Sequence, residues 1–156
     1  MAGRLTAVIL DPIGADPAHP LIVRERSAAI RDLSEGASKF QPAGRTDGSY
    51  RLRLSLSGRY LVLDVEDAES RPVARHMLSL TPLNRLIQDY FLVCESHISA
   101  IGKTTPDRVE AFDMGRRSVH NEGAAVLRDR LAGKIDVDLA TARRLFTLVC
   151  ALRWKG

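Results

Sequence analysis

The sequence predicts an α+β fold, with an N-terminal strand and an antiparallel β-meander packed against several C-terminal helices. Apolar residues alternate with polar ones over 50–56, and Leu61, Leu63 and Val65 share one face of the next stretch, which is the period-two pattern of strands. Apolar residues recur at steps of three and four over 83–101 and 142–152, which is the spacing of amphipathic helices. Because the strands come before most of the helices, we expect helices on one face of an antiparallel sheet and not a parallel βαβ winding.

The N-terminal half contains the expected strands. Residues 4–10 form an apolar strand, and a helix with rough amphipathic spacing follows over 21–33. The segment 40–49 is rich in Pro, Gly and Asp, so we expect an exposed loop there. The dipeptide Ser57-Gly58 is typical of a tight hairpin, and a third strand over 73–80 completes the meander.

The C-terminal half is expected to be helical. Thr81-Pro82 and Thr105-Pro106 each mark a helix start, because the Thr hydroxyl can cap free amides and Pro fits the first helical position. The second of these helices runs toward Ala132 and ends at Gly133, and the alternative is that Asn121-Glu122-Gly123 divides it into two pieces. Asp136 or Asp138 then caps a final helix.

Length and composition predict a single domain over 1–156. The chain has 156 residues, 45% apolar and 27% charged, which is ordinary for a globular protein. We expect a cytoplasmic protein, because the N-terminus resembles a strand more than a signal peptide and no apolar run is long enough to cross a membrane. Cys94 and Cys150 lie within apolar helical patterns and are expected in the core.

The charge pattern disfavours nucleic-acid binding. The net charge is only +4, and the C-terminal third interleaves basic with acidic residues. Arg51, Arg53 and Arg75 point away from the core of the meander, but Asp64 lies among them and no row of exposed aromatic residues accompanies them. We expect no cofactor, because no phosphate-binding loop or dinucleotide fingerprint occurs.

The segment 113–123 carries the candidate site. Arg116 falls on the apolar line of an amphipathic helix, and such exceptions to local rules cluster at functional or strained sites. Arg116 or Arg117 would hold an anionic group, and His120 would bind the ligand or transfer protons. The remaining candidates are Asn121, as a ligand-binding residue, and Glu122, as the group that orients His120 or as a second base.

Two features of this segment leave other interpretations open. On an unbroken helix Glu122 points away from His120 and Arg116, so the three converge only if the backbone breaks near Gly123. The alternative is a partly solvated helix held by ion pairs four residues apart, such as Asp113 with Arg117.

Two further histidines have a structural and a catalytic interpretation. His76 and His97 fall on apolar faces, where a neutral imidazole with a hydrogen-bond partner is common, although either would serve as a catalytic group beside His120. No ligand spacing typical of a metal site occurs, so we expect no metal.

Several of these stretches together resemble an uncharacterised bacterial protein family with no assigned activity. The resemblance rests chiefly on Asp-Met-Gly-Arg-Arg at 113–117 and His-Asn-Glu-Gly at 120–123, with further matching stretches at 78–82, 89–96 and 141–148. It covers most of the chain and implies a small cytosolic protein, without assigning a catalytic residue.

The leading hypothesis is a non-enzymatic binding or regulatory protein with an Arg/His groove for an anionic ligand or a protein partner. The first alternative is an enzyme that acts on a phosphate- or carboxylate-bearing substrate, with His120 as acid or base. The second is a structural subunit, for instance of a homo-oligomer, whose Trp154-bearing helix buries apolar area in an interface.

Overall fold

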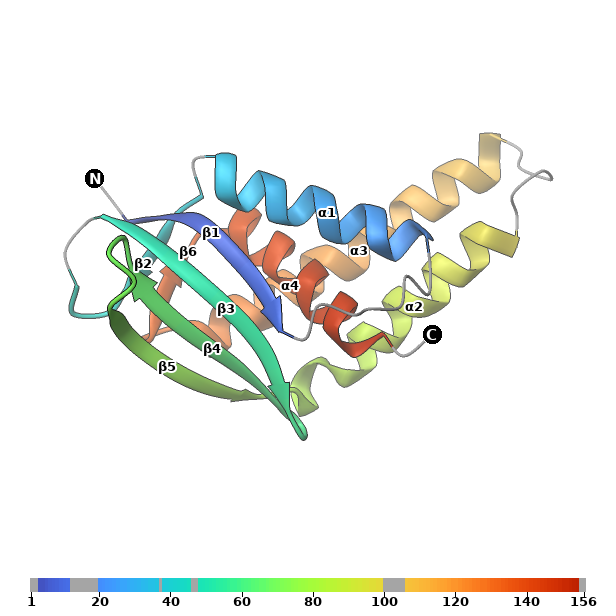
Figure 1. Ribbon diagram of the computed structural model, residues 1–156. Helices are drawn as coiled ribbons and strands as arrows, with labels where there is room; N and C mark the ends of the chain where they lie inside the picture. Colours follow the sequence, from blue (N-terminus) through green and yellow to red (C-terminus); the bar gives the residue numbers. More distant parts are fainter. Residues whose placement is uncertain (1–2, 12–19, 37, 46–47, 100–105, 155–156) are drawn as a thin grey trace.

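The computed structural model describes residues 3–11, 20–36, 38–45, 48–99 and 106–154, with the backbone alone over 96–99. The architecture is α+β, as predicted. A four-stranded sheet packs against a layer of helices, and a short two-stranded sheet lies beside it (Figure 1).

The large sheet contains the predicted meander. Its strands are β1 (Arg4–Asp11), β3 (Ser49–Ser57), β4 (Tyr60–Asp67) and β5 (Pro72–Ser79), in the order β1-β3-β4-β5. The last three pair antiparallel in sequence order. Gly58 opens the predicted hairpin between β3 and β4 with a φ of 59°, a value that favours glycine.

The N-terminal strand pairs in parallel with β3, so the expectation that parallel winding is absent is wrong. Helix α1 (Pro20–Glu35) connects the two strands and packs against β1. Because α1 returns the chain to the end of the sheet where β1 began, β3 runs in the same direction as β1 (Figure 1). The predicted order of a strand, a helix and a further strand is also the order of elements in a parallel crossover.

The segment after α1 is more ordered than an exposed loop. The strand β2 (Phe40–Pro42) pairs antiparallel with β6 (Ile135–Val137) to form the small sheet. Phe40 is completely buried and lies 6.4 Å from the Tyr50 ring, measured between ring centroids. The prediction of a loop is therefore wrong for residues 40–42, because burial of one aromatic ring overrides the turn-forming residues around it.

The helical layer follows the meander. A single 3-10 turn, η1 (Thr81–Leu83), leads into α2 (Asn84–Ser99), and α3 (Pro106–Leu131) and α4 (Leu139–Arg153) complete the layer. Asp138 caps α4, as one of the two predicted alternatives, by accepting a 2.8 Å hydrogen bond from the Thr141 amide.

The two Thr-Pro pairs have different outcomes. Thr81 does not cap a helix through its side chain, because Leu80 occupies the cap position of the 3-10 turn and makes no side-chain cap bond. Pro82 does lie in the first positions of that turn. The predicted cap at Thr105 lies outside the described residues, and α3 begins at Pro106.

Helix α3 runs unbroken through Gly123, so of the two alternatives the continuous helix is correct. The glycine has a packing role instead. A Cβ atom at this position would lie 2.5 Å from the Cδ1 and Cε1 atoms of Phe146, so only a residue without a side chain lets α3 approach α4 this closely.

Helix α4 is the centre of the core. It packs against α1, α2, α3 and β3, and most of its residues are buried. Cys94 and Cys150 are buried free thiols, as expected from their apolar surroundings. Trp154 ends the α4 seam by packing edge-on against Phe91, with ring centroids 4.9 Å apart. Within the described part of the chain, no helix has the length and apolar character needed to cross a membrane.

Candidate functional site

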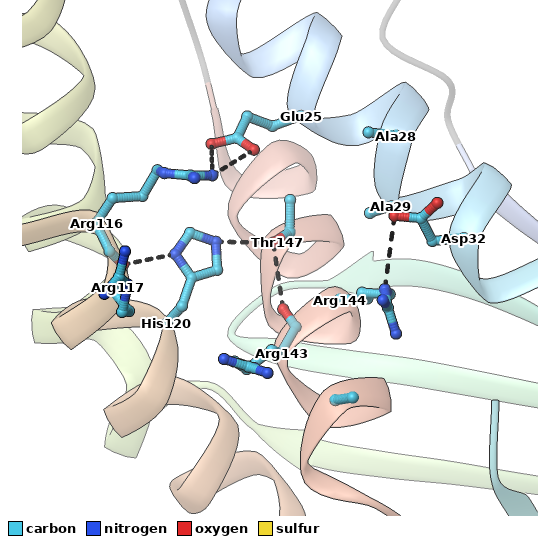
Figure 2. A pocket seen from close by; sticks show the side chains of 11 residues that line it. Glu25, Ala28, Ala29, Asp32, Arg116, Arg117, His120, Arg143, Arg144 and Thr147 are labelled. Carbon is cyan, nitrogen blue, oxygen red and sulfur yellow. Dashed lines mark hydrogen bonds and ion pairs between the residues drawn. The ribbon is translucent and has the colours of Figure 1, made fainter. Parts of the chain in front are cut away.

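His120 lies at the centre of the predicted site, and protein groups contact its ring and both of its ring nitrogens. Its ring packs edge-on against Tyr90 from α2 and Phe146 from α4, at centroid distances of 5.1 and 5.9 Å. Its Nδ1 atom lies 2.7 Å from the Arg116 carbonyl oxygen, and its Nε2 atom lies 2.9 Å from the Thr147 hydroxyl (Figure 2). A polar residue is therefore accommodated on an apolar helix face because both ring nitrogens have partners.

The partners of His120 determine its tautomer. A carbonyl oxygen only accepts, so Nδ1 carries a proton and donates it to Arg116. In the neutral ring Nε2 then accepts from the Thr147 hydroxyl. Burial lowers the pKa of His120 below its ordinary value, and the positive charges of Arg116 and Arg143 lower it further. The hydrogen bond to the Arg116 backbone and the negative charge of Glu25 oppose this shift. His120 is neutral at neutral pH.

Arg116 reaches across to α1. Its Nη1 atom lies 3.0 Å from both carboxylate oxygens of Glu25 (Figure 2). The Glu25 side chain is only 16% exposed and that of Arg116 is 40% exposed, so the pair is partly shielded from solvent. An arginine on the apolar line of α3 is thus explained by a charge partner that lies 91 residues away in the sequence.

A hollow of about 280 Å³ opens between α1, α3 and α4 beside these residues. Figure 2 shows Arg116 and His120 extending from α3 toward α1 and α4, with Arg143 beside the His120 ring. The lining consists of Glu25, Ala28, Ala29, Asp32, Arg116, Arg117, His120, Ala140, Arg143, Arg144 and Thr147. We call this hollow the Arg/His groove.

The charges of the Arg/His groove do not balance. Four guanidinium groups face two carboxylates, which leaves a formal charge of +2 with His120 neutral. Arg116 pairs with Glu25, and Arg144 lies 3.7 Å from Asp32.

The two remaining arginines have no carboxylate partner among the described residues. Arg143 donates a 3.3 Å hydrogen bond to the neutral Asn121 side chain. Arg117 is exposed and makes no hydrogen bond or ion pair within the described part of the chain. The predicted pairing of Asp113 with Arg117 is thus not formed. These two cations are the groups available to an anion.

The structure brings together part of the predicted site. Arg116, Arg117 and His120 line the groove, and Asn121 contacts it by accepting the hydrogen bond from Arg143. Glu122 is exposed and does not line the groove, because α3 continues through this position without the break that convergence required. A role for Asn121 and Glu122 in ligand binding stays a prediction.

Sequence reasoning missed the residues that α1 and α4 contribute. They are Glu25, Asp32, Arg143, Arg144 and Thr147. Thr147 offered the clearest signal, because it interrupts the apolar seam of α4 and is only 7% exposed. A buried hydroxyl in such a seam requires a hydrogen-bond partner, and that partner is His120.

The other predicted histidines lie outside this groove. His76 is half-buried on β5, and burial together with the charge of Lys134 lowers its pKa. The side chain of His97 lies outside the described residues. Among the side chains that the structure describes, no group of three or more His, Cys, Asp or Glu residues is arranged to hold a metal ion.

Comparison with known proteins places the chain among bacterial relatives of similar length. It is 53% identical to a UPF0262 protein of Rhizobium etli and 51% identical to one of Agrobacterium fabrum, in each case over 98% of this chain and 96% of the relative. A UPF0262 protein of Rhodopseudomonas palustris is 46% identical over 98% of this chain and 93% of the relative. No solved structure matches the chain significantly. The model of the uncharacterised protein family UPF0262 matches residues 2–155, and the chain belongs to this family.

Proposed function

We propose that the protein is a non-enzymatic, cytoplasmic binding protein whose Arg/His groove takes up a small anion. One observation carries the proposal: Arg117 and Arg143 line a hollow of net positive charge and have no carboxylate partner among the described residues. Guanidinium groups bind oxyanions through directed, charge-assisted hydrogen bonds, and a concave site concentrates their field.

The size of the groove favours a small ligand. Its volume of about 280 Å³ lies just below the range of roughly 300–1,000 Å³ that is usual for sites of drug-sized molecules. A compact anion therefore fits this space.

The hydrogen bonds of His120 favour binding over catalysis. A general acid or base must reach the proton that it transfers, and both ring nitrogens of His120 already face protein groups. The ring therefore acts as part of the wall that holds Thr147 and the α3 backbone in place.

Two other partner classes have less support. Nucleic acid would need free cations on the outer face of the sheet, but Arg53 lies 3.4 Å from Asp11 and Arg75 lies 3.4 Å from Asp64. A structural subunit assembled through the α4 seam would use Trp154, but this ring already packs edge-on against Phe91 within the chain and is only partly exposed.

The test is a calorimetric titration of the protein with sulfate at low ionic strength, using charge-matched variants. Arg143→Gln should weaken sulfate binding about tenfold, since it removes a hydrogen bond to a charged ligand that is worth roughly 1.5 kcal/mol. Arg128→Gln removes the same charge from an exposed position of α3 that does not line the groove, and it should change the affinity by less than about twofold. Equal effects of the two substitutions, or no binding of sulfate by the parent protein, would refute the proposal.

A further inference from the structure

We infer that the Arg/His groove selects a doubly charged oxyanion, of the phosphomonoester or sulfate type, and that Thr147 enables His120 to take up a proton when this dianion binds. The inference rests on the anion-binding function proposed above and adds the class of the ligand. Its first support is the formal charge of +2 on the lining, which a dianion neutralises and a monoanion halves.

The hydrogen bonds around Thr147 allow two arrangements. The Thr147 hydroxyl lies 2.9 Å from Nε2 of His120 and 3.2 Å from the Arg143 carbonyl oxygen. With a neutral ring the hydroxyl donates to Nε2 and leaves the Arg143 carbonyl without this donor. With a protonated ring Nε2 donates to the hydroxyl, which then turns to donate to Arg143. The protonated arrangement satisfies every group and requires only rotation of one hydroxyl.

The protein groups around the ring favour neutral His120. The charged groups that face it are Glu25 from α1, Arg116 from its own helix and Arg143 from α4. The titratable groups from α2 are Tyr90 and Cys94, which are neutral at physiological pH because burial raises the pKa of both, that of Cys94 to about 11. The Glu25 carboxylate already forms an ion pair with Arg116. Burial and the remaining guanidinium groups therefore disfavour a further positive charge on the His120 ring.

A bound dianion reverses this balance. It cancels the surplus charge next to His120, so the ring gains a proton more easily, and the hydrogen bonds for the protonated ring are already in place. A monoanion leaves a net positive lining and has a much smaller effect. By linkage, proton uptake and dianion binding strengthen each other.

The first arm of the experiment tests charge selection. At pH 7.5 methyl phosphate is mainly a dianion, because its second pKa is about 6, whereas methyl sulfate has similar size and a single charge. Methyl phosphate should bind at least about tenfold more tightly, since one extra charge interacts across a partly shielded site. A separate titration with sulfate shows whether the ligand is a free ion. If sulfate binds more tightly than methyl phosphate, the groove takes a free inorganic dianion. If methyl phosphate binds more tightly, the groove takes a phosphate group carried on a small molecule.

The second arm measures the proton. Sulfate does not titrate near neutral pH, so calorimetry in buffers of different ionisation enthalpy reports protons taken up by the protein. At pH 6.5 the parent should take up a fraction of a proton, at most about half, if the bound ring regains its ordinary pKa of 6.5. The His120 proton resonances, assigned by their absence in His120→Gln, should show the same rise in pKa.

Variants at Thr147 show whether the hydroxyl is responsible. Thr147→Val keeps the side-chain shape but leaves Nε2–H of the protonated ring without an acceptor, so proton uptake should fall at least twofold. Thr147→Ser retains the hydroxyl and should restore the uptake. If sulfate binds without proton uptake, if Thr147→Val takes up as many protons as the parent, or if methyl sulfate binds as tightly as methyl phosphate, this inference fails while anion binding stands. If none of the three anions binds, the proposed function fails with it.

Discussion

Two glycines on α3, about two turns apart, differ in how closely a neighbouring helix approaches them. Gly115 and Gly123 both occupy the interior of this helix. A Cβ atom added at Gly115 would meet a methyl group of Val93 at 3.6 Å, which is an ordinary contact. A Cβ atom added at Gly123 would lie 2.5 to 2.7 Å from three atoms of the Phe146 ring.

Alanine should therefore have opposite effects at the two positions. Replacing an interior helical glycine by alanine stabilises a helix by about 0.8–1 kcal/mol, and Gly115→Ala should gain close to this amount. At Gly123 the same gain is offset by overpacking, which typically costs 1–3 kcal/mol. The Phe146 ring is completely buried and cannot move into solvent, so we take the upper end of this range. The net destabilisation of Gly123→Ala is about 2 kcal/mol.

Thermal and urea unfolding measure both changes. For a chain of this size 1 kcal/mol corresponds to a Tm shift of roughly 2–4 °C, so Gly123→Ala should lower Tm by about 4–8 °C and Gly115→Ala should raise it by about 2–4 °C. Adding Phe146→Leu to Gly123→Ala should cost less than Phe146→Leu costs in the parent, because the clash is then absent. If both alanines raise the Tm equally, the close approach of α3 to α4 is wrong.

Two further outcomes follow from the groove and its histidine. Glu25→Gln removes a carboxylate from the lining and leaves Arg116 without its ion-pair partner. Titration with sulfate should then show a binding free energy more favourable by about 1 kcal/mol, which is a roughly fivefold higher affinity. Unchanged affinity would contradict the proposed place of the anion. Without ligand the free energy of unfolding should fall as the pH drops below about 6.5, because the unfolded chain binds protons at the ordinary histidine pKa while folding lowers the pKa of His120 and His76. His120→Gln should flatten this dependence in urea titrations at pH 7.5 and 5.5, and an unaltered slope would contradict it.

The parts of the fold that could be predicted are those that local periodicity encodes. The alternation over 50–56 and the helical spacing over 83–101 depend on one buried face each, so they predicted the meander and α2. Pairing partners are not local. The parallel pairing of β1 with β3 depends on how α1 packs, and the strand β2 exists because Phe40 is buried against distant residues.

The site residues also divide into those that local spacing predicts and those that depend on non-local contacts. Arg116 and His120 were found because they break the pattern of their own helix. Their partners Glu25 and Thr147 lie 91 and 27 positions away from them, and no rule of local spacing connects these positions. Whether α3 breaks near Gly123 could not be decided from the sequence for a related reason. A glycine required by a neighbouring helix looks the same in sequence as a glycine that ends a helix.

The residues that break the pattern of α3 are not themselves the groups that an anion would contact. Arg116 and His120 are satisfied by Glu25 and Thr147, so they fix how α3 lies against α1 and α4. Long-range polar contacts of this kind fix one arrangement of the elements that they join. Arg117 lines the groove next to these residues and has no carboxylate partner among the described residues. The paired residues therefore shape the groove, and the groups that would bind an anion are Arg117 and Arg143, which have no carboxylate partner in the described part of the chain.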